Sequence, residues 1–196
     1  SNYYGYMLHL ENTDKFQFQI QEDHSSDGVI ASASVTTGVW VHLVGVFDAG
    51  NNLKLYKNGC LASTTNTDIS TLTATSADFK LGAWSDEIDE VAIWNTALSA
   101  DAVAAIYNGG APIDLSENSG DYTSSSNLQG YWRMNEGTGS TVADDSDNSY
   151  TGTISGASWS STVPDYSLSL DGSDDCVSIA DADESDGKKR LEEEAE

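Results

Sequence analysis

Residues 81–110, LGAWSDEIDEVAIWNTALSADAVAAIYNGG, decide how this chain of 196 residues is organised. The first part of the stretch is rich in apolar and β-favouring residues and predicts a strand over 88–94. Because side chains alternate along a strand, two faces follow: Ile88, Ala92 and Trp94 on one, and Asp89, Val91 and Ile93 on the other. We therefore expect this strand to be buried on at least one side.

The second part of the stretch predicts a short helix. Ser99 suits the N-cap, Asp101 places a negative charge in the first turn, and Leu98 can pack on Val103. Gly109 supplies a left-handed stop. A helix of about two turns is not stable by itself, so we expect it to lie across a sheet.

Three segments within the first 110 residues carry a family resemblance: IDEVAIWN at 88–95, TGVWVHLV at 37–44 and LKLYKNG at 53–59. The first, with the helix after it, resembles the closing strand and terminal helix of laminin-G-like domains in the concanavalin A-like lectin/glucanase superfamily. The other two resemble that family's W-x-H strand and Y-x-N-G hairpin, in the family's order. The resemblance implies an all-β fold: an antiparallel jelly-roll β-sandwich with one short α-helix.

The character of the sequence changes after residue 110. Residues 111–127, APIDLSENSGDYTSSSN, are rich in Ser, Asn, Asp and Gly and predict a linker. The segment LQGYWRMNEGTG at 128–139 then resembles the first strand of the same family, and further matches continue that opening half: 142–148, 152–154, Trp159 and 168–179. The segment that resembles the first half of the family's fold thus comes after the segment that resembles its second half. This is a circularly permuted order.

The predicted organisation has four parts: a back half over 1–110, the linker over 111–127, a front half over 128–180 that closes on 1–110, and a disordered acidic tail over 181–196. A piece cut from a tandem array of repeats would have this order. We favour intramolecular closure to a monomer, because the linker keeps the halves at high local concentration; a swapped dimer is the alternative. One strand of the family is not found, and residues 1–5 are a candidate for its place.

The remaining strands of the back half are predicted at 6–10, 16–20, 29–35, 40–47, 53–56 and 79–81. Asn58-Gly59 predicts a two-residue hairpin, since both residues accept positive φ. A Ser/Thr-rich run over 63–77 predicts a loop with one edge strand.

The amino-acid composition limits the classes of partner that the chain is expected to bind. With 8 basic and 32 acidic residues, the net charge of −24 repels phosphate, so neither nucleic acid nor an anionic membrane surface is an expected partner. No apolar run is long enough to insert into a membrane, and we expect a soluble, excised piece from an extracellular, cell-surface or virion protein. Cys60 and Cys176 are predicted as buried, unpaired thiols, and a structural disulfide stays open.

A catalytic role is not expected. Retaining glucanases of this fold carry Glu-x-Asp-x-Glu on one strand face. Here Glu87 and Asp89 are followed on that face by Val91, while Glu90 is predicted to point to the opposite face. The three histidines occur without a nucleophile elbow: His9, His24 and His42. His42 is predicted to be packed and hydrogen-bonded, not to act as a base.

The resemblance implies a calcium ion between the closing strand and the opening half, with Asp89 as a ligand. The other predicted ligands are Asp171 and Gly172 in one turn, with Glu136 or Asp144 nearby, because calcium prefers carboxylate and carbonyl oxygens. The alternative is that Asp89 accepts backbone hydrogen bonds and that residues 144–148 form a solvated turn.

Exposed aromatic side chains are the expected platform for a carbohydrate. Trp84, Trp159 and Tyr150 are the candidates, whereas Trp40, Trp94 and Trp132 lie in apolar segments and are predicted in the core. The predicted function is a non-catalytic recognition or adhesion module that binds carbohydrate or an extracellular protein. The alternatives are a purely structural repeat of an extracellular or tail-fibre protein and, disfavoured by Val91, a glycoside hydrolase.

Overall fold

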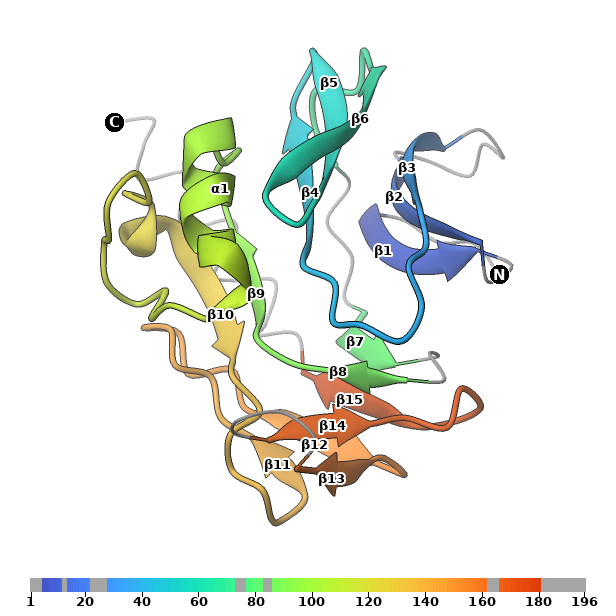
Figure 1. Cartoon of the computed structure of the whole chain (residues 1–196), viewed down its shortest axis with the longest axis vertical. Helices are drawn as coiled ribbons and strands as arrows, with labels where there is room; N and C mark the ends of the chain where they lie inside the picture. The colour runs from blue at the N-terminus through green and yellow to red at the C-terminus, as the bar shows by residue number, and fades with distance from the viewer. Residues whose placement is uncertain are drawn as a thin grey trace. The chain divides into compact units, whose positions relative to one another are not determined.

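The structure is a computed structural model that describes residues 5–11, 14–21, 28–72, 77–82, 86–161 and 166–180. Trp84, His24, residues 1–4 and the predicted tail over 181–196 lie outside these residues. The described chain forms several antiparallel sheets and one short α-helix, which confirms the predicted all-β class (Figure 1). No helix of the described chain is long and apolar enough to cross a membrane.

The chain divides into two compact units. The first unit consists of residues 1–75 and 94–127, and the second of residues 76–93 and 128–196. The second unit therefore combines strands from both sides of the predicted linker. The permuted order, the bounds of the two halves and closure within one chain stay predictions.

Two three-stranded antiparallel sheets form the first unit: β1 (Gly5–Glu11), β2 (Lys15–Gln21) and β3 (Val29–Ser34), and β4 (Leu43–Asp48), β5 (Asn52–Lys57) and β6 (Cys60–Asn66). The predicted alternation of β2 is confirmed, since Phe16, Phe18 and Ile20 are buried. The ring of Phe18 lies so close to Gly45 of β4 that a Cβ there would be 2.4 Å from it. The two sheets thus pack face to face through their apolar sides.

Local signals place the helix and one hairpin of this unit. Helix α1 (Ala100–Tyr107) begins as predicted, because the Ser99 side chain accepts a hydrogen bond from Ala102 N. It ends one residue earlier than the predicted stop: Asn108 takes the left-handed conformation with φ 42°. Asn58 and Gly59, with φ of 50° and 75°, form the predicted hairpin turn between β5 and β6. Two 3₁₀ turns follow the helix, η1 (Asn108–Gly110) and η2 (Ser125–Asn127).

The prediction of a buried strand through Trp40 is wrong. Strand β4 begins only at Leu43, and the residues before it are irregular. Val39 is 61% exposed and Trp40 49% exposed. Asn58 explains the break: it pairs with His42 through two hydrogen bonds, from His42 N to Asn58 Oδ1 and from Asn58 N to His42 O. The chain before His42 therefore lies beyond the ladder that β4 forms with β5.

The segment predicted as a linker is folded in the structure. Tyr122 is fully buried within the first unit. Its hydroxyl donates to Leu115 O at 2.8 Å and accepts from Trp94 Nε1 at 3.0 Å. The segment thus adds its own apolar anchor to the core of this unit.

The described residues of the second unit form nine short strands: β7 (Phe79–Gly82), β8 (Glu87–Ile88), β9 (Val91–Trp94), β10 (Leu128–Trp132), β11 (Thr141–Val142), β12 (Gly152–Ser155), β13 (Ser158–Ser160), β14 (Ser167–Ser169) and β15 (Cys176–Ile179). They form sheets with the orders β10-β9, β11-β12-β15-β7 and β13-β14-β8. Their shared core consists of Trp132, Met134, Val142, Leu168, Val177 and Ile179. Each strand that precedes the predicted linker pairs with one that follows it.

The predicted strand over 88–94 is interrupted. Glu90 has φ 51° and separates β8 from β9, as a bulge residue does. The predicted division of faces is therefore wrong: Ile88, Val91 and Ile93 all pack against the same core. The extra residue shifts the alternation by one between Ile88 and Val91, which brings Ile88, Val91 and Ile93 to the same side.

The two cysteines lie in different units, and both are free thiols in the structure. Cys60 is exposed at the start of β6, so the prediction that both thiols are buried is wrong for Cys60. Cys176 is half-buried at the start of β15.

Candidate functional site

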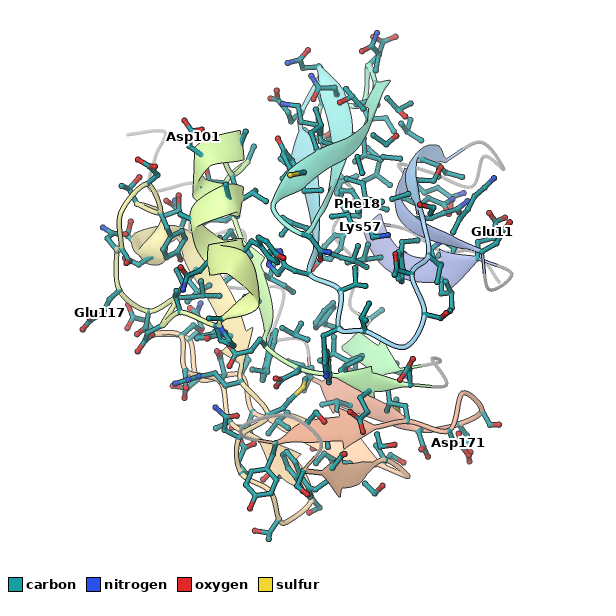
Figure 2. The ribbon with its side chains drawn as sticks, in the orientation of Figure 1. Glu11, Phe18, Lys57, Asp101, Glu117 and Asp171 are labelled. Carbon is teal, nitrogen blue, oxygen red and sulfur yellow. The ribbon has the colours of Figure 1, made fainter. Side chains whose placement is uncertain are left out.

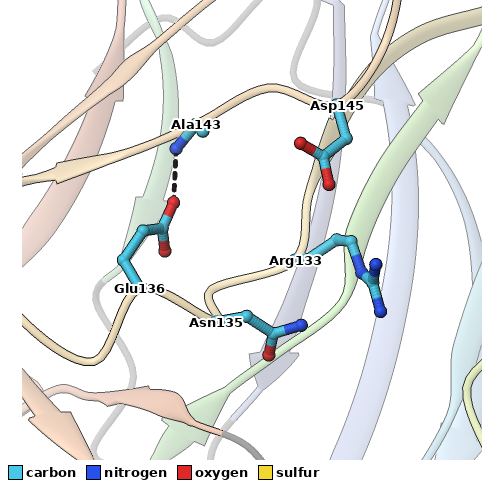
Figure 3. Close-up of a pocket in the computed structure, with 5 residues that line it drawn as sticks. All are labelled: Arg133, Asn135, Glu136, Ala143 and Asp145. Atoms are coloured by element: carbon cyan, nitrogen blue, oxygen red, sulfur yellow. Dashed lines mark hydrogen bonds between the residues drawn. The ribbon is translucent and has the colours of Figure 1, made fainter.

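An open surface cavity of about 280 Å³ lies in the second unit. Its lining comes from the segment after β10 and the segment after β11: Arg133, Asn135, Glu136, Ala143 and Asp145. Figure 3 shows these two segments on opposite sides of the cavity, with Ala143 N donating to Glu136 across it. That bond is 2.6 Å long, and a second link runs from Asp145 N to Tyr131 O at 2.8 Å. The two walls are therefore held at a fixed separation.

Asn135 is the most unusual residue of this cavity. Its Oδ1 atom is buried and accepts no hydrogen bond from the described residues. A buried acceptor without a donor costs about 1–3 kcal/mol. The preceding Met134 is fully buried with φ 57°, so the chain bends at the cavity wall where Asn135 follows. Because Oδ1 is enclosed by the protein, the folded chain itself bears this cost.

Arg133 is held in position by two neighbours. Glu90, in the bulge between β8 and β9, accepts a hydrogen bond from Arg133 Nε at 3.5 Å and another from the Tyr131 hydroxyl. The Arg133 guanidinium also lies 5.9 Å from the centre of the Tyr131 ring. A carboxylate and an aromatic ring together restrict the guanidinium, which lowers the entropic cost of using it to bind a ligand.

The charges of the cavity favour a neutral ligand. Among the described residues that line it, Arg133 is the one cation, and Glu136 and Asp145 are carboxylates. Figure 3 shows the Asp145 carboxylate and the Asn135 amide facing the same space beside the guanidinium. Such a set offers both donors and acceptors but an excess of negative charge, so it suits hydroxyl groups better than an anion.

Of the predicted metal ligands, Glu136 lines this cavity, and Asp144 accepts hydrogen bonds within the fold. The Asp144 carboxylate accepts four hydrogen bonds, listed by donor: Tyr131 N at 2.7 Å, Ser146 N at 2.9 Å, Ser146 Oγ at 2.9 Å and Tyr150 N at 2.8 Å. Both oxygens of Asp144 are thus occupied in joining β10 to the loop after β11.

Asp89 and Asp171 are not brought together. Strand β8 pairs with β14 through Ile88↔Leu168 and Glu87↔Ser169. In that register Asp89 falls opposite Ser167, which is four residues before Asp171, a separation of roughly 13 Å at about 3.3 Å per residue. Ligands of one calcium ion each lie about 2.3–2.6 Å from it, so these two aspartates cannot share an ion in this register.

Asp171 has other acidic neighbours, which the sequence analysis did not single out. The carboxylates of Asp171, Asp174 and Asp175 lie within 4.8 Å of one another on the loop between β14 and β15. Figure 2 shows Asp171 on this loop. Asp171 N donates to Asp175 Oδ2 at 3.0 Å, and Ser173 N donates to Asp171 Oδ1 at 2.8 Å. The predicted ligand Gly172 belongs to the same turn.

The predicted aromatic platforms are mostly engaged in packing. Trp159 is half-buried against the core, and its Nε1 donates to Gly139 O at 3.0 Å. Tyr150 also packs on the core, and its backbone accepts from Trp132 Nε1 at 2.8 Å. Trp84 lies outside the described residues. Tyr166, which the sequence analysis did not select, is 40% exposed.

Two carboxylates of the predicted closing strand, those of Glu87 and Glu90, accept hydrogen bonds from other segments. Glu87 accepts from Ser160 Oγ at 2.6 Å, whereas Glu90 is bound by Tyr131 and Arg133. The bulge at Glu90 removes the regular alternation on which the sequence argument about Glu90 depended. Val91 still packs against the core, so it leaves no third carboxylate in that position.

Histidine 42 lies beside helix α1 in the first unit. Its ring centre is 5.8 Å from that of Tyr107, and burial lowers the pKa of its imidazole below the ordinary value of 6.5. The ring packs on an aromatic side chain, as predicted, but its Nδ1 is buried and makes no hydrogen bond with the described residues, so the predicted hydrogen bonding is not found at that atom.

One comparison with known proteins gave a match. The family described as the Concanavalin A-like lectin/glucanases superfamily, a laminin-G-type family, matches residues 1–104. The chain therefore belongs to this superfamily, which confirms the resemblance and the predicted fold. Comparison with curated proteins and with solved structures gave no match.

Proposed function

We propose that the chain is a non-catalytic, lectin-like module that binds a neutral sugar in the Arg133–Asp145 cavity. The observation that carries this proposal is the lining of the cavity, in which an ordered guanidinium, an amide and two carboxylates gather around one opening. A sugar hydroxyl can donate to a carboxylate such as that of Asp145 and accept from the Arg133 guanidinium at the same time. An apolar ligand would offer these polar groups no hydrogen bonds, and an anion would meet two carboxylates.

The size of the cavity supports one sugar ring as the bound unit. Pockets for drug-sized ligands are about 300–1,000 Å³, and this cavity, at about 280 Å³, is just below that range. The fixed walls, joined by the bond from Ala143 N to Glu136, reduce the ordering required on binding. We place the module in an extracellular, cell-surface or virion protein, with an extracellular protein as the second class of partner.

Calorimetric titration with the methyl glycosides of glucose, galactose and mannose tests this proposal. At least one glycoside is expected to bind, and Asp145→Asn is expected to weaken it roughly ten- to hundredfold, because a hydrogen bond to a charged group is worth about 1.5–3 kcal/mol. Asp147→Asn is the matched control, since Asp147 is exposed and does not line the cavity. Binding by none of the three, or equal binding by wild type and Asp145→Asn, contradicts the proposal and favours a purely structural repeat.

Calcium stays a prediction, and one donor set in the described chain suits it. The carboxylates of Asp171, Asp174 and Asp175 offer the hard oxygen ligands that Ca²⁺ prefers. If calcium stabilises this loop, saturating calcium should raise the melting temperature of the wild type by about 2–4 °C relative to EDTA. Asp174→Asn should abolish that rise. An unchanged melting temperature of the wild type would show that no stabilising site exists.

A further inference from the structure

An exposed aromatic ring lies next to the rim of the cavity. Tyr166 packs on Gly137, where a Cβ would be 2.6 Å from the ring's Cζ and 2.7 Å from both Cε atoms. Gly137 follows Glu136, which lines the cavity, and adjacent Cα atoms are about 3.8 Å apart. The ring of Tyr166 is therefore one residue away from the cavity wall.

The backbone at this contact admits only glycine without strain. Gly137 has φ 64°, and any side chain there would meet the hydroxyl end of the Tyr166 ring. Gly137 thus lets the ring rest directly on the main chain. Because Tyr166 remains 40% exposed, the ring is supported on one side and open to solvent elsewhere.

The loop that carries this contact is restrained at both ends. Glu136 is bound by Ala143 N at its start, and Gly139 O accepts from Trp159 Nε1 at its end. Trp159 is itself packed against the core of the second unit. Gly137, on which the Tyr166 ring rests, is thus held in place, and a fixed support under the ring reduces the entropic cost of stacking on it.

We infer that Tyr166 forms a second sugar subsite, so that the site takes a chain of at least two sugar units. This inference rests on the proposed function of the cavity. One ring fills the cavity through its hydroxyl groups, and the next unit lies outside it with its apolar C–H face on the Tyr166 ring. Sugar rings expose such faces, and aromatic side chains bind apolar faces of matching size.

The test compares monosaccharides with disaccharides on the full chain. The probes are the methyl glycosides of glucose, galactose and mannose, and the disaccharides maltose, cellobiose, lactose and mannobiose. The best disaccharide is expected to bind about tenfold more tightly than the best methyl glycoside. Tyr166→Leu should remove that tenfold gain and leave the methyl glycoside unchanged, whereas Tyr166→Phe should preserve both.

Leucine retains an apolar cover over Gly137, so a folded Tyr166→Leu protein is expected, and its melting temperature serves as the check. Equal affinity for mono- and disaccharides overturns the second subsite while the proposed function stands. The same conclusion follows if Tyr166→Leu weakens both ligands equally. Failure of every probe to bind overturns the proposed function and this inference together.

Discussion

Replacing Asp144 by alanine is expected to lower the free energy of unfolding by about 3–5 kcal/mol. The change removes both acceptors from three backbone N–H groups and one hydroxyl, contributed by Tyr131, Ser146 and Tyr150. Donors left without a partner cost about 1–3 kcal/mol each when buried, and Tyr131 is fully buried. Because water reaches part of the loop, the loss of unfolding free energy is expected to be smaller than the sum of these separate costs.

Urea unfolding followed by circular dichroism measures this loss. Asp147→Ala is the control from the same loop, and it should change the unfolding free energy by no more than about 0.5 kcal/mol, because Asp147 is exposed. The loss in Asp144→Ala should be the same with calcium and with EDTA, since the carboxylate acts through hydrogen bonds. A loss seen only in the presence of calcium would restore Asp144 as a metal ligand.

Several features were predictable because a few neighbouring residues determine them. The alternation of Phe16, Phe18 and Ile20 needs only one sheet face to be buried, and the structure buries all three. Ser99 caps α1 with its own side chain, and Asn58-Gly59 adopts positive φ in a hairpin. In each case the stabilising partner lies within three residues or is the general apolar core.

The features that were missed depend on partners far away in the sequence. The bulge at Glu90 is supported by Tyr131 and Arg133, which are 41 and 43 residues later. No local pattern at Glu90 indicates such partners, so a regular strand was the natural prediction. The separation of Asp89 from Asp171 could not be predicted for the same reason, because it follows from the pairing of β8 with β14.

The cavity itself gave a weak signal in the sequence. Arg133, Asn135 and Glu136 lie within four residues directly after an apolar strand, a polar cluster that could have suggested a site. Asp145 joins them only because the loop after β11 folds back onto the segment after β10. Nothing in the sequence around Tyr166 indicates a role in binding. That role depends on the contact of its ring with Gly137, which has no side chain.

Trp132→Ala and Trp40→Ala should differ sharply in their effect on stability, although the sequence predicts both tryptophans in the core. Trp132 is 2% exposed, stacks on Phe79 at 5.6 Å between ring centres and donates to Tyr150 O. Its truncation is expected to cost about 3–5 kcal/mol through the lost burial and the resulting cavity. Trp40 is 49% exposed, and its truncation should cost less than about 1 kcal/mol.

The same urea unfolding experiment, followed by circular dichroism, measures both effects. Trp132→Phe is the intermediate variant: it keeps an aromatic ring against Phe79 but loses the bond to Tyr150 O, so a cost of about 1–2 kcal/mol is expected. Equal large losses for Trp40→Ala and Trp132→Ala would mean that Trp40 is buried in solution and that the strand predicted from residue 40 forms. A small loss for Trp132→Ala would contradict the core of the second unit, because that core holds strands from both sides of residues 111–127 together around this indole.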